Sequence, residues 1–209
     1  MRTWGYSGQV GEWLGAIAIP PERRQPPIAA AEWLLGDAAE LLRALHRPRE
    51  LRISWAEFDA AGRELAFHEP DAFELAGWDE VAVRLKEIAA GARGRFALGS
   101  LFLTMDTAII ESGLELWANS SAELQISIAP PENDPVEASL SYRTFIDVWL
   151  TSTRNEAGAW RSNAAYSMEN LPRLAALLAS FRALVGRSFR VGASFFYHDR
   201  ISGTGFSGG

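Results

Sequence analysis

The chain has 209 residues, of which 48% are hydrophobic and 22% charged, and this globular composition excludes an intrinsically disordered protein. It contains no cysteine, which excludes disulfides, thiolate metal sites and a cysteine nucleophile. Its formal net charge of −6 argues against nucleic acid as a partner, because phosphate binding needs a basic surface.

The length predicts one domain over residues 1–209. The amino terminus lacks the basic and apolar regions of a signal peptide, and charges interrupt every long apolar stretch. We therefore expect a cytoplasmic protein without a membrane segment.

The first 27 residues are rich in Gly, Pro and Trp and are expected to be irregular, with at most an edge strand over 11–19 before Pro20 and Pro21. A helix is predicted after Pro27 and ends by Pro48. Its apolar stripe consists of Leu34, Ala38, Leu41, Leu42 and Leu45.

Alternation over 51–56 predicts a strand, and 64–68 returns as its hairpin partner. A second helix is predicted over 78–90, with Gly91 as its carboxyl-terminal stop.

Four strand-like runs follow, over 95–105, 113–117, 123–128 and 136–150, with a turn at 130–135. A third helix is expected to begin near Asn170, a favourable N-cap, with Pro172 in its first turn. A last strand is predicted over 188–198, and the Gly- and Ser-rich tail 202–209 is expected to be flexible.

These elements predict an α+β fold, a mostly antiparallel sheet with about three helices on one side. A shift of 93 residues superposes the second helix and the following strand on the third helix and the last strand. Two interpretations stay open: a duplicated helix–strand unit, or the chance similarity of any amphipathic helix followed by a buried strand.

Charge is unevenly distributed along the chain. Residues 101–150 contain eight acidic residues and one basic residue, whereas residues 151–209 contain seven arginines and three acidic residues. Either the two segments neutralise each other in the fold, or the first forms an acidic face that receives a basic partner.

No motif predicts a cofactor or a metal. The run Gly203–Gly208 spells the dinucleotide fingerprint but has no helix after it. His46, His68 and His198 lack the spacing of metal ligands, and the acidic turn around Asn133 lacks the pattern of an EF-hand. Neither Ser7, between Tyr6 and Gly8, nor Ser194, between Ala193 and Phe195, lies on a nucleophile elbow.

A partner-binding surface is predicted on the strands at 113–128 and 136–150. Phe145, Asp147 and Trp149 alternate with the apolar residues Ile146, Val148 and Leu150, so we expect them on the face away from the core. Aromatic residues beside carboxylates suit a protein interface. The predicted set is Glu115, Trp117, Glu123, Phe145, Asp147 and Trp149.

The function that fits this character is that of a non-enzymatic protein-binding protein, in particular an immunity protein that neutralises a bacterial toxin through a basic toxin domain. This is an analogy from composition. A structural subunit of a phage or secretion-type assembly is the second hypothesis. A hydrolase using carboxylates such as Glu115, Glu123, Glu137 and Asp147 is the third. A homodimer is compatible with each.

Overall fold

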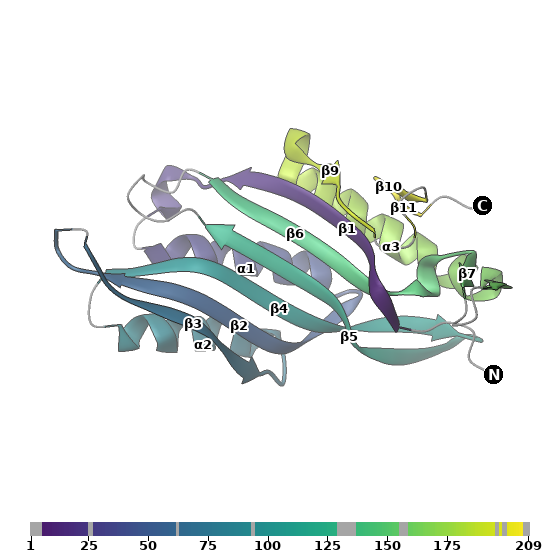
Figure 1. The fold of residues 1–209 in the computed structure, drawn as a ribbon, viewed down its shortest axis with the longest axis horizontal. Coiled ribbons are helices and arrows are strands. Elements are labelled where there is room, and N and C mark those ends of the chain that lie inside the picture. Colours follow the sequence, from purple (N-terminus) through teal and green to yellow (C-terminus); the bar gives the residue numbers. More distant parts are fainter. Residues whose placement is uncertain are drawn as a thin grey trace.

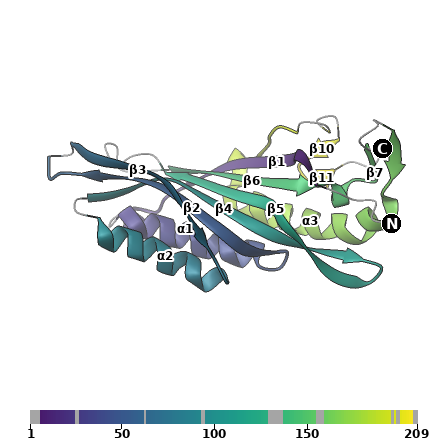
Figure 2. The ribbon, with the colours of Figure 1, turned by 60° about the horizontal axis from the view of Figure 1, so that its bottom comes forward.

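The fold is an antiparallel sheet with three α-helices against one of its faces, as seen in a computed structural model that describes residues 6–24, 27–61, 63–92, 95–128, 137–154, 159–194, 197 and 200–206. Figure 2 shows all three helices beneath the sheet. The α+β prediction is therefore confirmed.

The main sheet has seven strands in the order β3-β2-β4-β5-β6-β1-β9, and adjacent strands are antiparallel throughout (Figure 1). Their bounds are β1 Tyr6–Ala18, β2 His46–Phe58, β3 Glu64–Glu74, β4 Arg95–Glu111, β5 Leu114–Ile128, β6 Glu137–Ile146 and β9 Arg190–Val191. Two small hairpins accompany it, β7 Ser152–Arg154 with β8 Trp160–Ser162, and β10 Ile201–Ser202 with β11 Gly205–Phe206.

The helices are α1 Pro27–Leu42, α2 Trp78–Gly91 and α3 Ala164–Val185, and short 3₁₀ turns lie at Pro21–Arg23, Asp147–Trp149 and Gly186–Ser188. Of the apolar stripe predicted for the first helix, Leu34, Ala38 and Leu42 are buried in α1, Leu41 is half-buried, and Leu45 is buried just after the helix. The other two helices bury Val81 and Leu85 in α2, and Leu174, Leu177, Leu178 and Phe181 in α3. Gly186, at φ +59°, ends α3, in agreement with the preference of glycine for this conformation after a helix.

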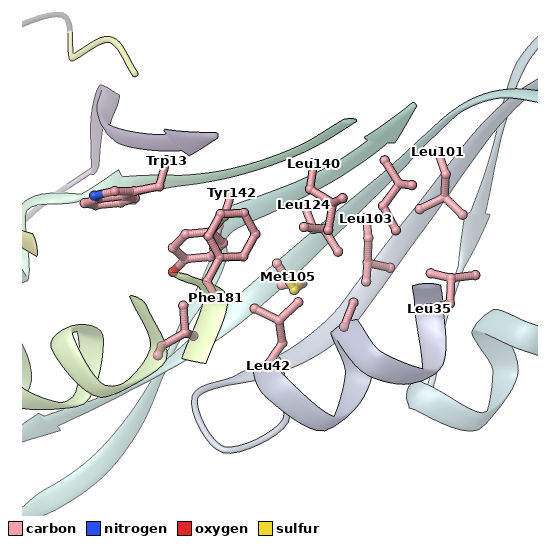
Figure 3. Close-up of a cluster of buried hydrophobic side chains, with 14 of the residues drawn as sticks. Trp13, Leu35, Leu42, Leu101, Leu103, Met105, Leu124, Leu140, Tyr142 and Phe181 are labelled. Carbon is pink, nitrogen blue, oxygen red and sulfur yellow. The ribbon is translucent and has the colours of Figure 1, made fainter. Parts of the chain in front are cut away.

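The core lies between these stripes and one face of the sheet (Figure 3). Leu101, Leu103, Leu124, Leu140 and Tyr142 project from neighbouring strands towards the helices. The end of α3 packs closely on β1 at Gly15. A Cβ atom at this position would lie 2.5 Å from Val185, so the close approach requires glycine.

Two predictions about the chain ends are wrong. The described part of the amino-terminal segment is not irregular up to Ala18: β1 pairs with β6 along most of its length, so Trp13 and the glycines of β1 lie in a sheet. The tail is not loose up to Phe206, which is buried edge-on against Trp13, with ring centroids 5.8 Å apart. Residues 207–209 lie outside the described residues.

The runs 113–117 and 123–128 are parts of one strand, β5. A tight turn at Ser112 and Gly113, both at positive φ, joins it to β4, as expected for a two-residue hairpin. The interruption in the pattern is a bulge at Ser120, whose amide donates to the buried Asp106. The turn at 130–135 lies outside the described residues.

The strand expected over 188–198 is shorter within the described residues, where Arg190 and Val191 pair with β1 and 192–194 are not in a strand. Positions 195, 196, 198 and 199 are outside the described residues. The equivalent of this strand under the 93-residue shift would be β4, a 17-residue strand inside the sheet. The structure therefore gives no support to a duplicated helix–strand unit at this point.

Candidate functional site

One face of the main sheet carries polar side chains, and no helix among the described residues covers it. Side chains alternate between the two faces along each strand, so every second residue lies on this open face. Paired residues of neighbouring strands form rows across it. One row contains Glu50, Thr104, Glu123, Arg143 and Glu12, and the next contains Arg52, Phe102, Gln125, Ser141 and Leu14.

An ion-pair ladder crosses the open face from β1 to β2. Arg143 lies between two carboxylates, with Nε 2.8 Å from Glu12 Oε1 and Nη1 2.9 Å from Glu123 Oε1. Arg52 Nη2 lies 3.2 Å from Glu123 Oε2. The ladder therefore balances its own charges.

Hydrogen bonds and ion pairs shift the pKa of two members of this ladder, Glu12 and Arg143. Burial by itself raises the pKa of Glu12, but hydrogen bonds from Arg143, the Ala193 amide and Ser141 bring it below its usual value. The same ion pairs raise the pKa of Arg143 against the opposing effect of burial. These groups are charged at neutral pH and already have partners.

The structure separates the six residues predicted to bind a partner. Glu123 belongs to the ladder, and Phe145, two residues after Arg143, lies half-buried on the same open face. Glu115 and Trp117 lie on the β4–β5 hairpin. There Glu115 faces Arg173 at 3.6 Å, and the Arg47 guanidinium lies 4.5 Å from the centre of the Trp117 ring.

The predicted exposure of Asp147 and Trp149 is wrong. The strand ends at Ile146, and Asp147–Trp149 form a 3₁₀ turn, so the alternation of faces stops there. Trp149 is 0% exposed, and its indole Nε1 donates to Thr144 Oγ1 at 2.9 Å. Asp147 is also buried. Neither side chain can contact a partner in this conformation.

Ion pairs neutralise Asp106, Glu115 and Glu123 of the acidic segment 101–150, the first and the last through arginines outside 151–209. Asp106 pairs with Arg47 at 2.9 Å, and Glu123 with Arg52 and Arg143. Glu115 pairs instead with Arg173, so an ion pair joins this segment to 151–209 within the described part of the chain.

Three of the four carboxylates proposed for a hydrolase, Glu115, Glu123 and Glu137, lie far apart, and the fourth, Asp147, is buried in the 3₁₀ turn. Glu115 and Glu123 are eight residues apart on β5, and Glu123 is level with Arg143, six residues from Glu137 on β6. At about 3.3 Å per residue these separations are roughly 20 Å or more, whereas paired glycosidase carboxylates lie about 5–9.5 Å apart.

The histidines also lie apart. His46 is buried, with Nε2 2.9 Å from the Tyr142 hydroxyl and Nδ1 3.1 Å from Thr107 Oγ1, and burial lowers its pKa to about 3. His68 is on the edge strand β3, and His198 is outside the described residues. Within the described part of the chain no three His, Asp or Glu side chains are grouped to hold a metal ion.

A cavity of about 570 Å³ lies between the edge strand β3, its neighbour β2 and the end of α2. His68 stacks on Trp55, with ring centroids 3.7 Å apart and planes at 7°, and His68 Nε2 lies 3.2 Å from Glu57 Oε1. The lining residues are Trp55, Glu57, Leu65, Ala66, His68, Phe73, Glu87, Ile88 and Gly91.

The elements around this cavity, β3 and α2, are acidic, and we call them together the acidic edge (residues 64–91). Their sequence has seven acidic and two basic residues. Leu65 and Phe67 on β3 are 57% and 58% exposed, and Glu64 and Glu69 beside them are exposed. Large exposed apolar side chains grouped on a strand are typical of an interaction surface.

Periodicity in the sequence predicts 64–68 only as a hairpin partner and does not reveal the acidic edge. The signal was present: Glu64, Glu69 and Glu74 occur in a run that also contains Leu65 and Phe67. What the pattern could not show is that this strand lies at the end of the sheet order.

The chain matches no protein-family model, and neither a curated protein nor a solved structure is similar to it. No helix within the described residues combines the length and apolarity needed to cross a membrane.

Proposed function

We propose that this chain is a non-catalytic protein-binding protein that contacts its partner through the acidic edge. The observation that carries the proposal is the position of β3, which pairs only with β2 among the described residues while exposing Leu65 and Phe67. Two large apolar side chains cost free energy in water and gain it when a partner covers them.

The charge of the acidic edge supports a basic partner. Complementary charge raises the rate of encounter, and the aromatic and aliphatic side chains then supply contact area. The ion-pair ladder of the open face is less suited to steering such a partner, because its charges already neutralise one another.

The specific role we propose is that of an immunity protein, acting in the cytoplasm against a toxin with a basic domain. The alternative, a subunit of a phage or secretion-type assembly, also needs a protein interface but no toxic partner. The immunity role expects the product of the adjacent gene to be toxic to the cell, whereas the structural-subunit role expects it to be harmless.

The test is co-expression with the product of the gene adjacent to this one. If the immunity role is correct, that product stops growth when expressed alone, and this chain restores growth. The double variant Leu65→Glu/Phe67→Glu should lose protection while keeping its melting temperature, since both side chains are exposed.

The matched control is Met168→Glu, because Met168 is 77% exposed on α3, away from the acidic edge. This variant should protect as well as the wild type does. An adjacent product that is harmless but binds the chain would favour the structural-subunit role. A toxic product against which the chain gives no protection contradicts the immunity role.

A further inference from the structure

Resting on the proposed protein-binding function, we propose that the acidic edge binds an extended basic segment of the partner, which adds a strand to β3 and inserts a lysine or arginine side chain into the Trp55–His68 cavity. The occupant is thus a peptide segment of another protein rather than a small molecule or a second copy of this chain.

The backbone of β3 is available for strand addition. β3 is the last strand in the sheet order and runs for 11 residues, against two in the edge strand β9 at the opposite side. Two register shifts against β2 and Pro70, which has no N–H, interrupt it, so its regularly paired stretches are 66–68 and 71–74. Alternate residues of an edge strand direct their N–H and C=O groups away from the sheet, where a further strand can pair with them. Figure 1 shows β3 as the lower border of the sheet.

Both faces of β3 offer a place for the side chains of an added strand. Phe67, level with Ala56, lies on the open face, where Ala56, Phe58 and Ala97 form a small buried cluster. The cavity lies on the helix side, next to His68 and Trp55. Since successive side chains of a strand point to opposite faces, one set would cover Phe67 and the other would enter the cavity.

The chemistry of the cavity favours a cationic side chain. Glu57 carries its carboxylate into the lining and is 9% exposed, while the stacked rings of Trp55 and His68 present π surface. Phe73 and Ile88 line the same space and suit the aliphatic part of a lysine or arginine. The volume of about 570 Å³ is within the range of preformed ligand sites.

The charge of the acidic edge argues against a second copy. Two β3 strands paired with each other would bring Glu64, Glu69 and Glu74 of both chains onto one ladder. Like charges facing each other across strands destabilise the pairing, and charged edge strands keep sheets from self-association. A basic segment replaces that repulsion with attraction.

The experiment uses the full chain and a synthetic peptide of about eight residues, alternating valine and arginine, with blocked ends; this length matches an ordinary strand. Binding is measured by titration calorimetry, and amide hydrogen exchange locates it. We expect slower exchange at alternate β3 amides. We also expect binding about tenfold weaker for the same peptide methylated on alternate backbone nitrogens, since it lacks those donors.

Two protein variants test the side-chain contacts. Glu57→Gln should weaken binding about tenfold by removing the charge inside the cavity. If that variant does not fold, the exposed pair Glu64→Lys/Glu69→Lys should weaken binding about fivefold at low salt and less as salt rises, because screening shortens the range of the charges. Glu115→Gln, on the distant β4–β5 hairpin, is the control and should bind as the wild type.

Equal binding of the methylated peptide, or of a peptide with glutamate in place of arginine, would overturn the proposal. So would a dimer of the chain that the peptide dissociates, because the edge would then belong to a second copy. If the chain protects cells through Leu65 and Phe67 but does not bind the peptide, strand addition is refuted and the proposed function stands. Peptide binding without any protective activity would do the reverse.

Discussion

The side chain of Asn170 forms two hydrogen bonds with the backbone of Ile110. The Ile110 amide donates to Asn170 Oδ1 at 2.7 Å, and Asn170 Nδ2 donates to the Ile110 carbonyl at 2.8 Å. β2 reaches β4 only as far as Thr107, so Ile110 lies on a part of β4 that β2 does not pair with. Asn170, inside α3 and 0% exposed, takes the place of a strand there.

This arrangement predicts the effect of changing Asn170. Asn170→Leu keeps the size of the side chain but removes the partners of two backbone groups. The free energy of unfolding should fall by roughly 2–6 kcal/mol, from about 1–3 kcal/mol for each of the two unsatisfied groups. Urea unfolding measures this, with the exposed Met168→Leu of the same helix as control.

Asn170→Ser separates this role from that of an N-cap, which the sequence suggested. Serine is as good a cap as asparagine, but its short side chain does not reach Ile110. A stability equal to that of the wild type would show that the contact with Ile110 contributes nothing.

His46 should make stability depend on pH between 5 and 7. Burial lowers its pKa to about 3, whereas an unfolded chain keeps about 6.5. Below pH 6.5 the unfolded chain therefore binds a proton that the folded chain does not. As the pH falls below 6.5, the free energy of unfolding therefore decreases by about 1.4 kcal/mol per pH unit. The total decrease from pH 7 to pH 5 is roughly 2 kcal/mol.

The variant His46→Gln should lose this slope, because glutamine does not titrate. The measurement is the difference in unfolding free energy between wild type and variant at several pH values, in which the contributions of other groups cancel. Glu12, with its lowered pKa, adds stability that is lost only as pH falls below its unfolded value of 4.5, outside this window. A constant difference from pH 7 to pH 5 would refute the buried, neutral state of His46.

Leu178 should contribute to the core through α3. It is 0% exposed, so Leu178→Ala removes buried surface and leaves a cavity, at a cost of roughly 2–5 kcal/mol. Thermal or urea unfolding measures the loss. Leu65→Ala, at an exposed apolar position on β3, should change stability by less than about 0.5 kcal/mol.

Trp149 should act on folding rather than on binding. Trp149→Phe removes the hydrogen bond to Thr144 and part of a fully buried ring, so we expect a loss of roughly 1–3 kcal/mol in unfolding free energy. Trp160→Phe, at a side chain that is 49% exposed, is the matched control. A variant as stable as the wild type would restore Trp149 as a candidate for partner contact.

Local periodicity was enough to predict the helices and several of the strands. A second helix was predicted over 78–90, against Trp78–Gly91 in the structure, and a strand over 123–128, where Leu124, Ile126 and Ile128 share a buried face. Side chains one turn or two residues apart share a face by geometry alone, so such patterns can be read without knowing what covers them.

The candidate site was not predictable in the same way, because it depends on contacts between residues far apart in the chain. Alternation made Trp149 look exposed, but the strand ends three residues earlier. Glu123 looked like a free acid, and its arginine partners come from positions 52 and 143. Asn170 looked like a cap, and its partner is 60 residues away.

For the same reason, the sequence predicted β3 as a hairpin partner but not as a binding surface. Its sequence fixes an extended strand with acidic and apolar side chains, but its place at the end of the sheet follows from the pairing of β2 with β4 on its other side. Periodicity sets which face of an element is apolar. Packing of distant segments sets which charges are neutralised, which aromatic rings are buried and which edge of the sheet is left without a neighbouring strand.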